Sequence, residues 1–208
     1  MPDQKKPESG RKSAYVARNR AAILNATLVV LAEHGKDVTV EQVAEQSEMA
    51  LSTVYKHFKN KEELVIETIL DSFEKWETGV ESQALKLKDP LERFVYPMRL
   101  FVRLNKTHPH HAQTLVNYFD VIAKIFPILQ SKLIGHIEEL SKAKLVSVDD
   151  PAVAGRNMHA ILTFAVIAQV TNPKSKENDG DGAVRVGLSM LGISEAKAKK
   201  LTESKIIL

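Results

Sequence analysis

The 208-residue sequence contains no cysteine. Without thiols the chain can form no disulfide, no thiolate nucleophile and no Cys-ligated metal site, which is typical of a reducing compartment. Long apolar runs are missing as well, because the most apolar window, Ala160–Val170, is too short to span a bilayer. The charged N-terminus has no apolar stretch behind it, unlike a secretory signal. We therefore expect a soluble cytoplasmic protein.

Patterns of β-structure and of common catalytic loops are also absent. Residues 16–80 show no period-two alternation and contain no β-hairpin dipeptide, so the pattern predicts an all-α fold. No Gly-rich phosphate loop and no nucleophile motif occurs in the sequence. We therefore expect no enzymatic activity and no cofactor.

The positive charge is unevenly distributed along the chain. The net charge of +3 comes entirely from residues 1–61, which hold 10 Lys and Arg against 7 Asp and Glu, while residues 62–208 hold 19 of each sign. Residues 1–14 lack apolar periodicity and are rich in Lys, Pro, Ser and Gly, so we expect a disordered basic arm there. Such an arm suits a polyanion, because neutralised phosphates release counterions. The alternative is a solvated tail that keeps the protein soluble.

Four helices are predicted between residues 16 and 80. The first ends at His34-Gly35. Thr39 and Gln42 have the spacing of a capping box, and a short helix is therefore expected to begin at Val40. A second short helix carries Val54 and Phe58 on its apolar side. A long helix starts at Lys61 and has its apolar stripe at Ile66, Ile69, Leu70, Phe73, Trp76 and Val80.

Further breaks at proline divide the rest of the chain. The pattern predicts helices at about 91–106, 110–125, 127–145, 152–171 and 182–192, with a polar loop at 171–182 and a loose or helical tail. The expected organisation is a basic arm at 1–14, a first helical domain at 15–61 and a second helical domain at 62–208.

Two short helices joined by a few residues, the first with a Thr cap, are typical of a helix-turn-helix. The second helix of this motif lies in the major groove. Val54 and Phe58 are expected to point into the core. The residues left to face DNA are Leu51, Ser52, Thr53, Lys56 and His57, with Tyr55 and Lys61 placed to reach phosphates.

Residues 39–65, TVEQVAEQSEMALSTVYKHFKNKEELV, resemble the DNA-binding segment of the TetR family of bacterial regulators. The matching positions are Thr39, Val43, Ala44, Met49, Thr53, Val54, Tyr55, His57, Phe58, Lys61, Glu62 and Leu64. The chain departs from the family pattern at the turn glycine, which is Glu48, and at the serine cap of the second helix, which is Ala50. Leu51 replaces a residue that is usually polar, which suggests contact with a thymine methyl group.

The resemblance implies roles for individual residues. Thr39, Tyr55, His57 and Lys61 would hold phosphates, whereas Ser52, Thr53 and Lys56 would lie near base edges. It also implies a homodimer on a palindromic operator, because two-fold symmetry doubles the short site that one helix reads. Repression relieved by a small apolar or amphipathic ligand is the family's usual mode of action.

The resemblance makes residues 15–61 a DNA-binding domain and residues 62–208 a helical effector-binding and dimerisation domain. The large apolar candidates for ligand contact are Phe73, Trp76, Phe101, Leu104, Leu115, Tyr118, Phe119, Ile122 and Phe164, with His159 as a polar anchor. The alternative is an ordinary core, which is what such an apolar stripe more often forms. Small residues on the last two helices would allow close approach of a partner: Ala152, Ala154, Gly155, Ala160, Gly187, Ser189 and Gly192.

Two alternatives remain from the sequence. His108, His110 and His111 crowd one turn and are of the residue type that binds zinc, which would indicate a metal-binding protein or an enzyme. Pro109 bends this segment, and no carboxylate lies within it. The other alternative is a DNA-binding organiser of the same fold without a small-molecule effector.

Overall fold

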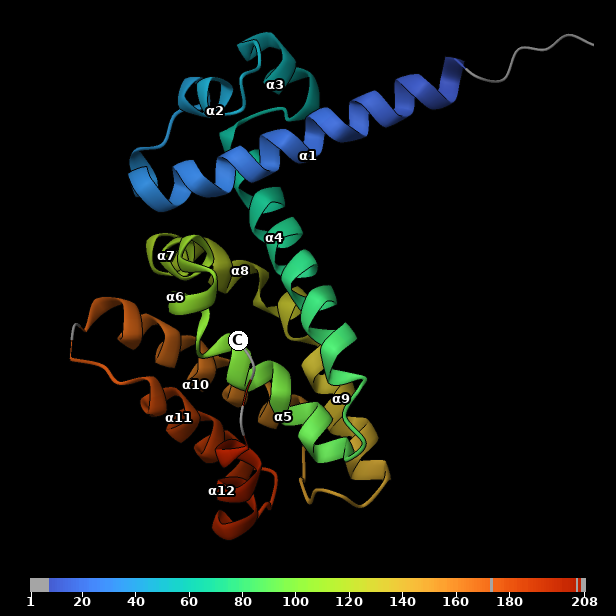
Figure 1. Cartoon of the computed structure of the whole chain (residues 1–208), viewed down its shortest axis with the longest axis vertical. Coiled ribbons are helices and arrows are strands. Elements are labelled where there is room, and N and C mark those ends of the chain that lie inside the picture. Colours follow the sequence, from blue (N-terminus) through green and yellow to red (C-terminus); the bar gives the residue numbers. More distant parts are fainter. Residues whose placement is uncertain (1–7, 173, 205, 207–208) are drawn as a thin grey trace, which may run out of the picture. The chain divides into compact units, whose positions relative to one another are not determined.

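The computed structural model describes residues 8–172, 174–204 and 206. These residues form α-helices and one turn of 3₁₀ helix, with no β-strand among them (Figure 1). The elements are α1 (Glu8–His34), η1 (Gly35–Asp37), α2 (Val40–Gln46), α3 (Leu51–His57), α4 (Lys61–Ala84), α5 (Pro90–Phe101), α6 (Leu104–Thr107), α7 (Pro109–Asn117), α8 (Phe119–Leu129), α9 (Ser131–Lys142), α10 (Pro151–Thr171), α11 (Glu177–Ser189) and α12 (Glu195–Glu203). The predicted all-α fold is confirmed.

The chain divides into two compact units, Met1–Ser72 and Phe73–Leu208. The first contains α1, α2, α3 and the beginning of α4, and the second contains the remaining helices. The boundary thus falls inside α4, about one-half of the way along it, rather than at residue 61 where we expected the first domain to end.

Unit 1 is a small three-helix domain closed by the first turns of α4. α1 packs against α2, and α2 packs against α3. The buried apolar side chains that form its core are Ile23, Leu24, Val30, Leu31, Val38, Val40, Val43, Val54, Phe58, Leu64, Val65 and Ile69. Arg20 of α1 forms an ion pair with Glu67 of α4, and its guanidinium lies 5.4 Å from the centre of the Phe58 ring. This arginine therefore joins α1 to α4 and to Phe58, the residue directly after α3.

The start of α1 corrects one expectation. The helix begins at Glu8, so residues 8–14 are helical rather than disordered, and Met1–Pro7 lie outside the described residues. Residues 11–18 are all exposed. Apolar periodicity reports burial, and it therefore gives no signal for a helical turn that contacts nothing. Arg, Lys and Ala, which dominate this stretch, are good helix formers.

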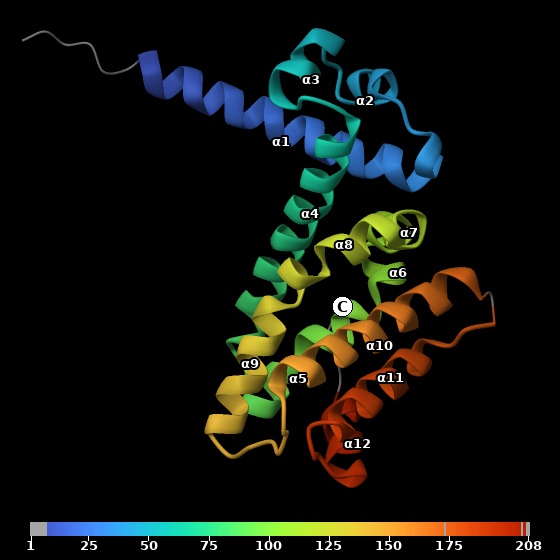
Figure 2. The ribbon, with the colours of Figure 1, turned by 180° about the vertical axis from the view of Figure 1, so that it is seen from behind.

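Unit 2 is built around α10. This helix packs against α11, α9 and α7, and α11 in turn packs against α5 and α12 (Figures 1 and 2). Acidic caps followed by proline start two of its helices. Asp89 accepts hydrogen bonds from the amides of Leu91 and Glu92, and Asp150 accepts from those of Ala152 and Val153.

Several details of unit 2 differ from the expected pattern. Pro127 does not break the chain but lies within the last turn of α8. The predicted helix at 91–106 is interrupted after Phe101, and α11 begins at Glu177, inside the predicted polar loop. Among the described residues, no helix combines the length and the apolar character that crossing a membrane would require.

Two glycines of α10 and α11 let neighbouring helices approach closely within unit 2. A Cβ added at Gly155 would lie 2.6 Å from Cγ1 of Ile134, and one at Gly187 would lie 3.2 Å from the side chain of Met158. These glycines thus allow α9, α10 and α11 to approach one another within the unit. The expected role of the small residues at a dimer interface stays a prediction.

Candidate nucleic-acid interface and effector site

The first helix of the helix-turn-helix is held at both ends by local hydrogen bonds. Thr39 Oγ1 accepts from the Gln42 amide at 3.2 Å, and Gln42 Oε1 accepts from the Thr39 amide at 2.8 Å. At the other end the amide of Met49 donates to Ala44 O and that of Glu48 donates to Glu45 O, which is the Schellman pattern. Glu48 has a φ of 55°, a left-handed conformation that favours glycine. The predicted capping box is therefore confirmed, and the turn forms despite the missing glycine.

The short helix α3 has one buried side and one exposed side. Val54 is 1% exposed and Phe58, directly after the helix, is 2% exposed. Leu51 and Tyr55 are 37% and 49% exposed. Ala50 provides no side-chain cap to the helix, as the sequence indicates.

The other predicted DNA-contacting residues lie on or next to this exposed side. Ser52, Lys56, Thr39 and Lys61 are exposed, whereas Thr53 and His57 are half-buried. Lys61 Nζ donates to the carbonyl of Lys36 at 3.0 Å, which keeps this side chain next to η1. None of the eight predicted residues is buried in unit 1.

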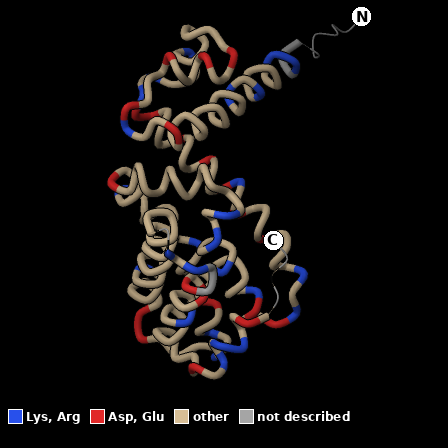
Figure 3. The backbone as a smooth tube through the Cα atoms, turned by 60° about the vertical axis from the view of Figure 1, so that its left-hand side comes forward, with Lys and Arg blue, Asp and Glu red and all other residues tan. Residues whose placement is uncertain are grey.

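A second feature of unit 1 is the exposed first part of α1. In Figures 1 and 2 this helix continues well past α2 and α3 toward its N-terminal end, and Figure 3 marks its basic residues. Arg11, Lys12 and Arg18 are exposed, and the sequence contains no acidic residue from Ser9 to Ala32. Positive charge therefore extends along unit 1 away from α3.

Unit 2 contains a chain of seven aromatic rings with His159 in its middle. The imidazole lies 4.8 Å from the Phe126 ring and 6.4 Å from the Phe101 ring, measured between centres. Phe101 contacts the rings of Phe73 and Trp76 on α4, and Phe126 leads through Phe119 to Phe164. We call these seven residues the aromatic cluster. They come from α4, α5, α8 and α10.

His159 is largely buried in this cluster. Burial lowers the pKa of His159 to about 4, because the charged form loses its hydration there. The imidazole is therefore neutral at physiological pH. Its Nδ1 is buried and has no hydrogen-bond partner among the described residues.

Comparison with known proteins places the helix-turn-helix in a family. The family of bacterial regulatory proteins called the tetR family matches residues 23–68, which run from α1 through α2 and α3 into α4. This segment of the chain is therefore similar to the DNA-binding domain of TetR-family transcriptional regulators. No curated protein matches its sequence.

Solved structures agree with this assignment at the level of the fold. RolR in complex with resorcinol has a TM-score of 0.69 and 18% identity, and the match covers 94% of this chain and 98% of RolR. The fatty acid degradation regulator FadR from Bacillus halodurans has a TM-score of 0.68 and 18% identity, with 89% and 97% covered. FadR from Bacillus subtilis with stearoyl-CoA has a TM-score of 0.68 and 17% identity, with 82% and 98% covered.

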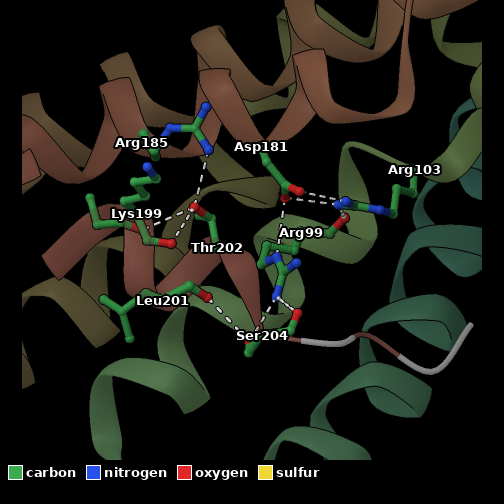
Figure 4. A network of polar contacts seen from close by, with 9 residues as sticks. Arg99, Arg103, Asp181, Arg185, Lys199, Leu201, Thr202 and Ser204 are labelled. Atoms are coloured by element: carbon green, nitrogen blue, oxygen red, sulfur yellow. Dashed lines mark hydrogen bonds and ion pairs between the residues drawn. The ribbon is translucent and has the colours of Figure 1, made fainter. Parts of the chain in front are cut away.

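A network of buried charges in unit 2 holds α5, which carries Phe101 of the aromatic cluster (Figure 4 shows the network). Asp181 of α11 accepts from Arg103 at 2.9 and 2.6 Å and from Arg99 Nε at 3.1 Å. Arg99 also donates to the carbonyl and hydroxyl oxygens of Ser204. Burial raises the pKa of Asp181, but the hydrogen bonds and charges of the two arginines outweigh it and lower the pKa below its ordinary value. The network joins α5 to α11 and to the end of α12.

The ligand-contact candidates fall into two groups in the structure. Phe73, Trp76, Phe101, Phe119, His159 and Phe164 meet in the aromatic cluster. The other four are buried in unit 2: Leu104, Leu115, Tyr118 and Ile122. Sequence reasoning missed Phe126, although it lies seven residues after Phe119 and so on the same side of α8.

The predicted histidine cluster does not gather a metal-binding group. The rings of His108 and His111 are 5.2 Å apart, and burial lowers the pKa of His108. Within the described part of the chain, no three His, Cys, Asp or Glu side chains are grouped so that they could hold a metal ion. The alternative of a zinc protein or metalloenzyme thus has no support from the geometry.

Proposed function

We propose that this regulator binds duplex DNA by placing the exposed side of α3 in the major groove. The observation that carries the proposal is the division of α3 into a buried side, Val54 with Phe58, and an exposed side that bears Ser52, Thr53 and Lys56. A helix that is fixed to the core by Val54 and Phe58 on one side and carries polar residues on the other is the arrangement that reads base edges. Tyr55, His57 and Lys61 then hold the flanking phosphates.

The exposed part of α1 supplies a further contact with DNA. Arg11, Lys12 and Arg18 extend the positive charge of unit 1 beyond α3. Positive charge spaced along a helix neutralises phosphates without reading sequence. The helix therefore increases affinity for every duplex and lengthens the protected segment.

The protein acts as a homodimer on a palindromic site. Val153 and Phe164 of α10 and Val186 of α11 are 41%, 58% and 54% exposed, and these two helices pack side by side in unit 2. Exposed large apolar residues on neighbouring helices are typical of an oligomer interface. A two-fold dimer places two recognition helices about 34 to 36 Å apart, one turn of DNA.

A small molecule bound at the aromatic cluster releases the dimer from DNA. α4 carries Phe73 and Trp76 of the cluster and continues without a break into unit 1, where Lys61 begins it. A ligand that shifts this helix changes the position of α3 and the match to successive grooves. The expected coupling is on the order of 1 to 3 kcal/mol. RolR with resorcinol and FadR with stearoyl-CoA are examples of similar folds that bind small molecules.

Selection of bound duplexes from a random pool tests this function. The purified full-length protein is expected to enrich one sequence with two-fold symmetry and half-sites about one helical turn apart. Enrichment of asymmetric sequences, or of none at low salt, would contradict the proposal. Repression is then tested by placing the enriched sequence over a promoter and measuring transcription with and without the protein.

A further inference from the structure

Two buried threonines of unit 2 differ from the other helical threonines. Thr27, Thr68, Thr171 and Thr202 each donate a hydrogen bond to the carbonyl four residues earlier, which is the usual solution for threonine in a helix. Thr114 of α7 and Thr163 of α10 are 3% and 1% exposed, yet their hydroxyl oxygens have no partner among the described residues. Such groups cost free energy when buried.

The unpartnered hydroxyls lie on α10 and on a helix packed against it. Thr163 follows His159 by one turn of α10, so both side chains lie on the same side of the helix. Nδ1 of His159, Oδ1 of Asn105 and Nε2 of Gln169 are likewise buried without a partner among the described residues. Asn105 lies on α6 and Thr114 on α7, and both of these helices pack against α10. Five polar atoms without partners thus come from α10, which carries His159 of the aromatic cluster, and from two helices packed against it.

We propose that this site binds a neutral, flat aromatic compound with a hydroxyl or carbonyl oxygen, whose ring packs on Phe126 and Phe101 and whose oxygen bonds to Thr163 and His159. The inference rests on the proposed function because it names the ligand class of the same effector site. Aromatic rings favour a flat ring in offset or edge contact. Buried donors and acceptors favour a ligand that pairs with them, since a compound without polar atoms leaves them unsatisfied.

Charge decides between a neutral and an ionised ligand. The ring contacts of His159 are with Phe101 and Phe126, and the other buried side chains that carry an unpartnered atom are Asn105, Thr114, Thr163 and Gln169; none of these residues bears a charge. The imidazole itself is neutral, as its lowered pKa shows. The buried arginines Arg99 and Arg103 of unit 2 already share Asp181. An ionised ligand would lose its hydration here without gaining a counter-charge.

The test compares matched probes on the full-length protein. Phenol and 2-naphthol are neutral and carry a hydroxyl, benzoate and 2-naphthoate are ionised, and toluene and naphthalene have no hydrogen-bonding group. Binding is measured without DNA, by the shift in melting temperature and by calorimetric titration. For the one-ring probes, emission of Trp76, the single tryptophan of the chain, is a local readout because its ring contacts Phe101. We expect at least one hydroxylated probe to bind more tightly than its ionised and hydrocarbon counterparts.

Isosteric variants identify the atoms responsible. Thr163→Val and His159→Phe should each weaken binding of the hydroxylated probe about 2- to 10-fold, the range of one neutral hydrogen bond, and leave the hydrocarbon unaffected. Thr171→Val on the same helix is the control, because its hydroxyl already bonds to Ile167 O at 2.8 Å. Without any probe, Thr163→Val should raise the melting temperature by removing an unsatisfied buried hydroxyl. This readout stands independently of ligand identity.

The inference is overturned if neither hydroxylated probe binds better than its ionised counterpart, or if Thr163→Val and His159→Phe bind it as the wild type does. A lower melting temperature for Thr163→Val would show that the hydroxyl has a structural partner. Failure of the proposed function is a separate outcome. A probe that binds with the expected preference but does not release a selected duplex leaves the ligand class intact and contradicts effector-controlled DNA release.

Discussion

Arg103 and Asp181 form a buried ion pair in which Nη2 and Oδ2 lie 2.6 Å apart and both side chains are less than 10% exposed. Arg99 shares the same carboxylate from one turn earlier on α5. Phe101 lies between these arginines in sequence and therefore on the opposite side of the helix, where it contacts Trp76 and His159. The ion pairs thus hold α5 in the position from which Phe101 joins α4 to α10.

Asp181→Asn is expected to destabilise the protein by about 3 to 5 kcal/mol, because it leaves two buried guanidinium groups without a counter-charge. Chemical denaturation monitored by circular dichroism measures this. Glu203→Gln in the exposed pair Lys199–Glu203 is the control and should cost less than about 1 kcal/mol. Since the folded-state pKa of Asp181 is lowered, its stabilisation is present above the unfolded-state pKa and is lost as the pH falls through the folded-state pKa. Equal effects of the two substitutions would contradict this account.

The free energy of unfolding should also depend on pH through the protonation of His159. Because burial lowers its pKa from 6.5 to about 4, the unfolded chain binds a proton in this pH interval that the folded protein does not. Stability is therefore complete above about pH 6.5 and declines toward pH 4, by on the order of 3 kcal/mol from this residue. Free energies of unfolding measured across this range should show a smaller decline for His159→Phe. Parallel curves for both proteins would mean that the imidazole is accessible to solvent.

The turn between α2 and α3 contains a strained glutamate. Glu48 adopts a φ of 55° at a position where glycine has no steric cost, so Glu48→Gly should stabilise the protein by about 1 kcal/mol. Glu45→Gly, three residues earlier inside α2, is the matched control and should destabilise it by a similar amount. Thermal unfolding distinguishes the two. Loss of stability in both variants would show that the left-handed conformation carries no strain.

The exposed part of α1 should contribute to DNA affinity through charge alone. Replacement of Arg11, Lys12 and Arg18 by alanine is expected to weaken binding to all duplexes and to reduce the slope of log K against log salt by about 2 to 3. The control replaces Lys197, Lys199 and Lys200 on α12, which are also exposed but belong to unit 2. An unchanged salt slope in the α1 variant would show that the exposed part of α1 makes no contact with DNA phosphates.

The helix-turn-helix was predictable because its signals are local. The Thr39–Gln42 capping box and the buried pair Val54 and Phe58 each depend on residues at most four positions apart. Short-range hydrogen bonds and side-chain periodicity therefore determine the start of α2 and the orientation of α3. The first turns of α1 were not predicted as helix, because their side chains are exposed and apolar periodicity reports only burial.

The aromatic cluster was only partly predictable for the opposite reason. Its members come from helices far apart in the sequence, and Phe126 meets His159 across 33 positions. Because Pro127 was expected to break the chain, Phe126 directly before it was not included among the ligand-contact candidates. In the structure α8 continues through this proline. Unpartnered hydroxyls such as that of Thr163 cannot be recognised from sequence, since each threonine has the same local option to bond its own helix.

The most direct test measures how a selected duplex and its point variants bind Thr53→Ala and Lys61→Ala at several salt concentrations. If α3 reads the major groove, Thr53→Ala changes the preference among the point variants by about 1 to 3 kcal/mol at one base position, with little change in salt dependence. Lys61→Ala should weaken all duplexes alike and reduce the salt slope by about 1. Wild-type binding by both variants, with unchanged sequence preference and salt slope, would contradict the account.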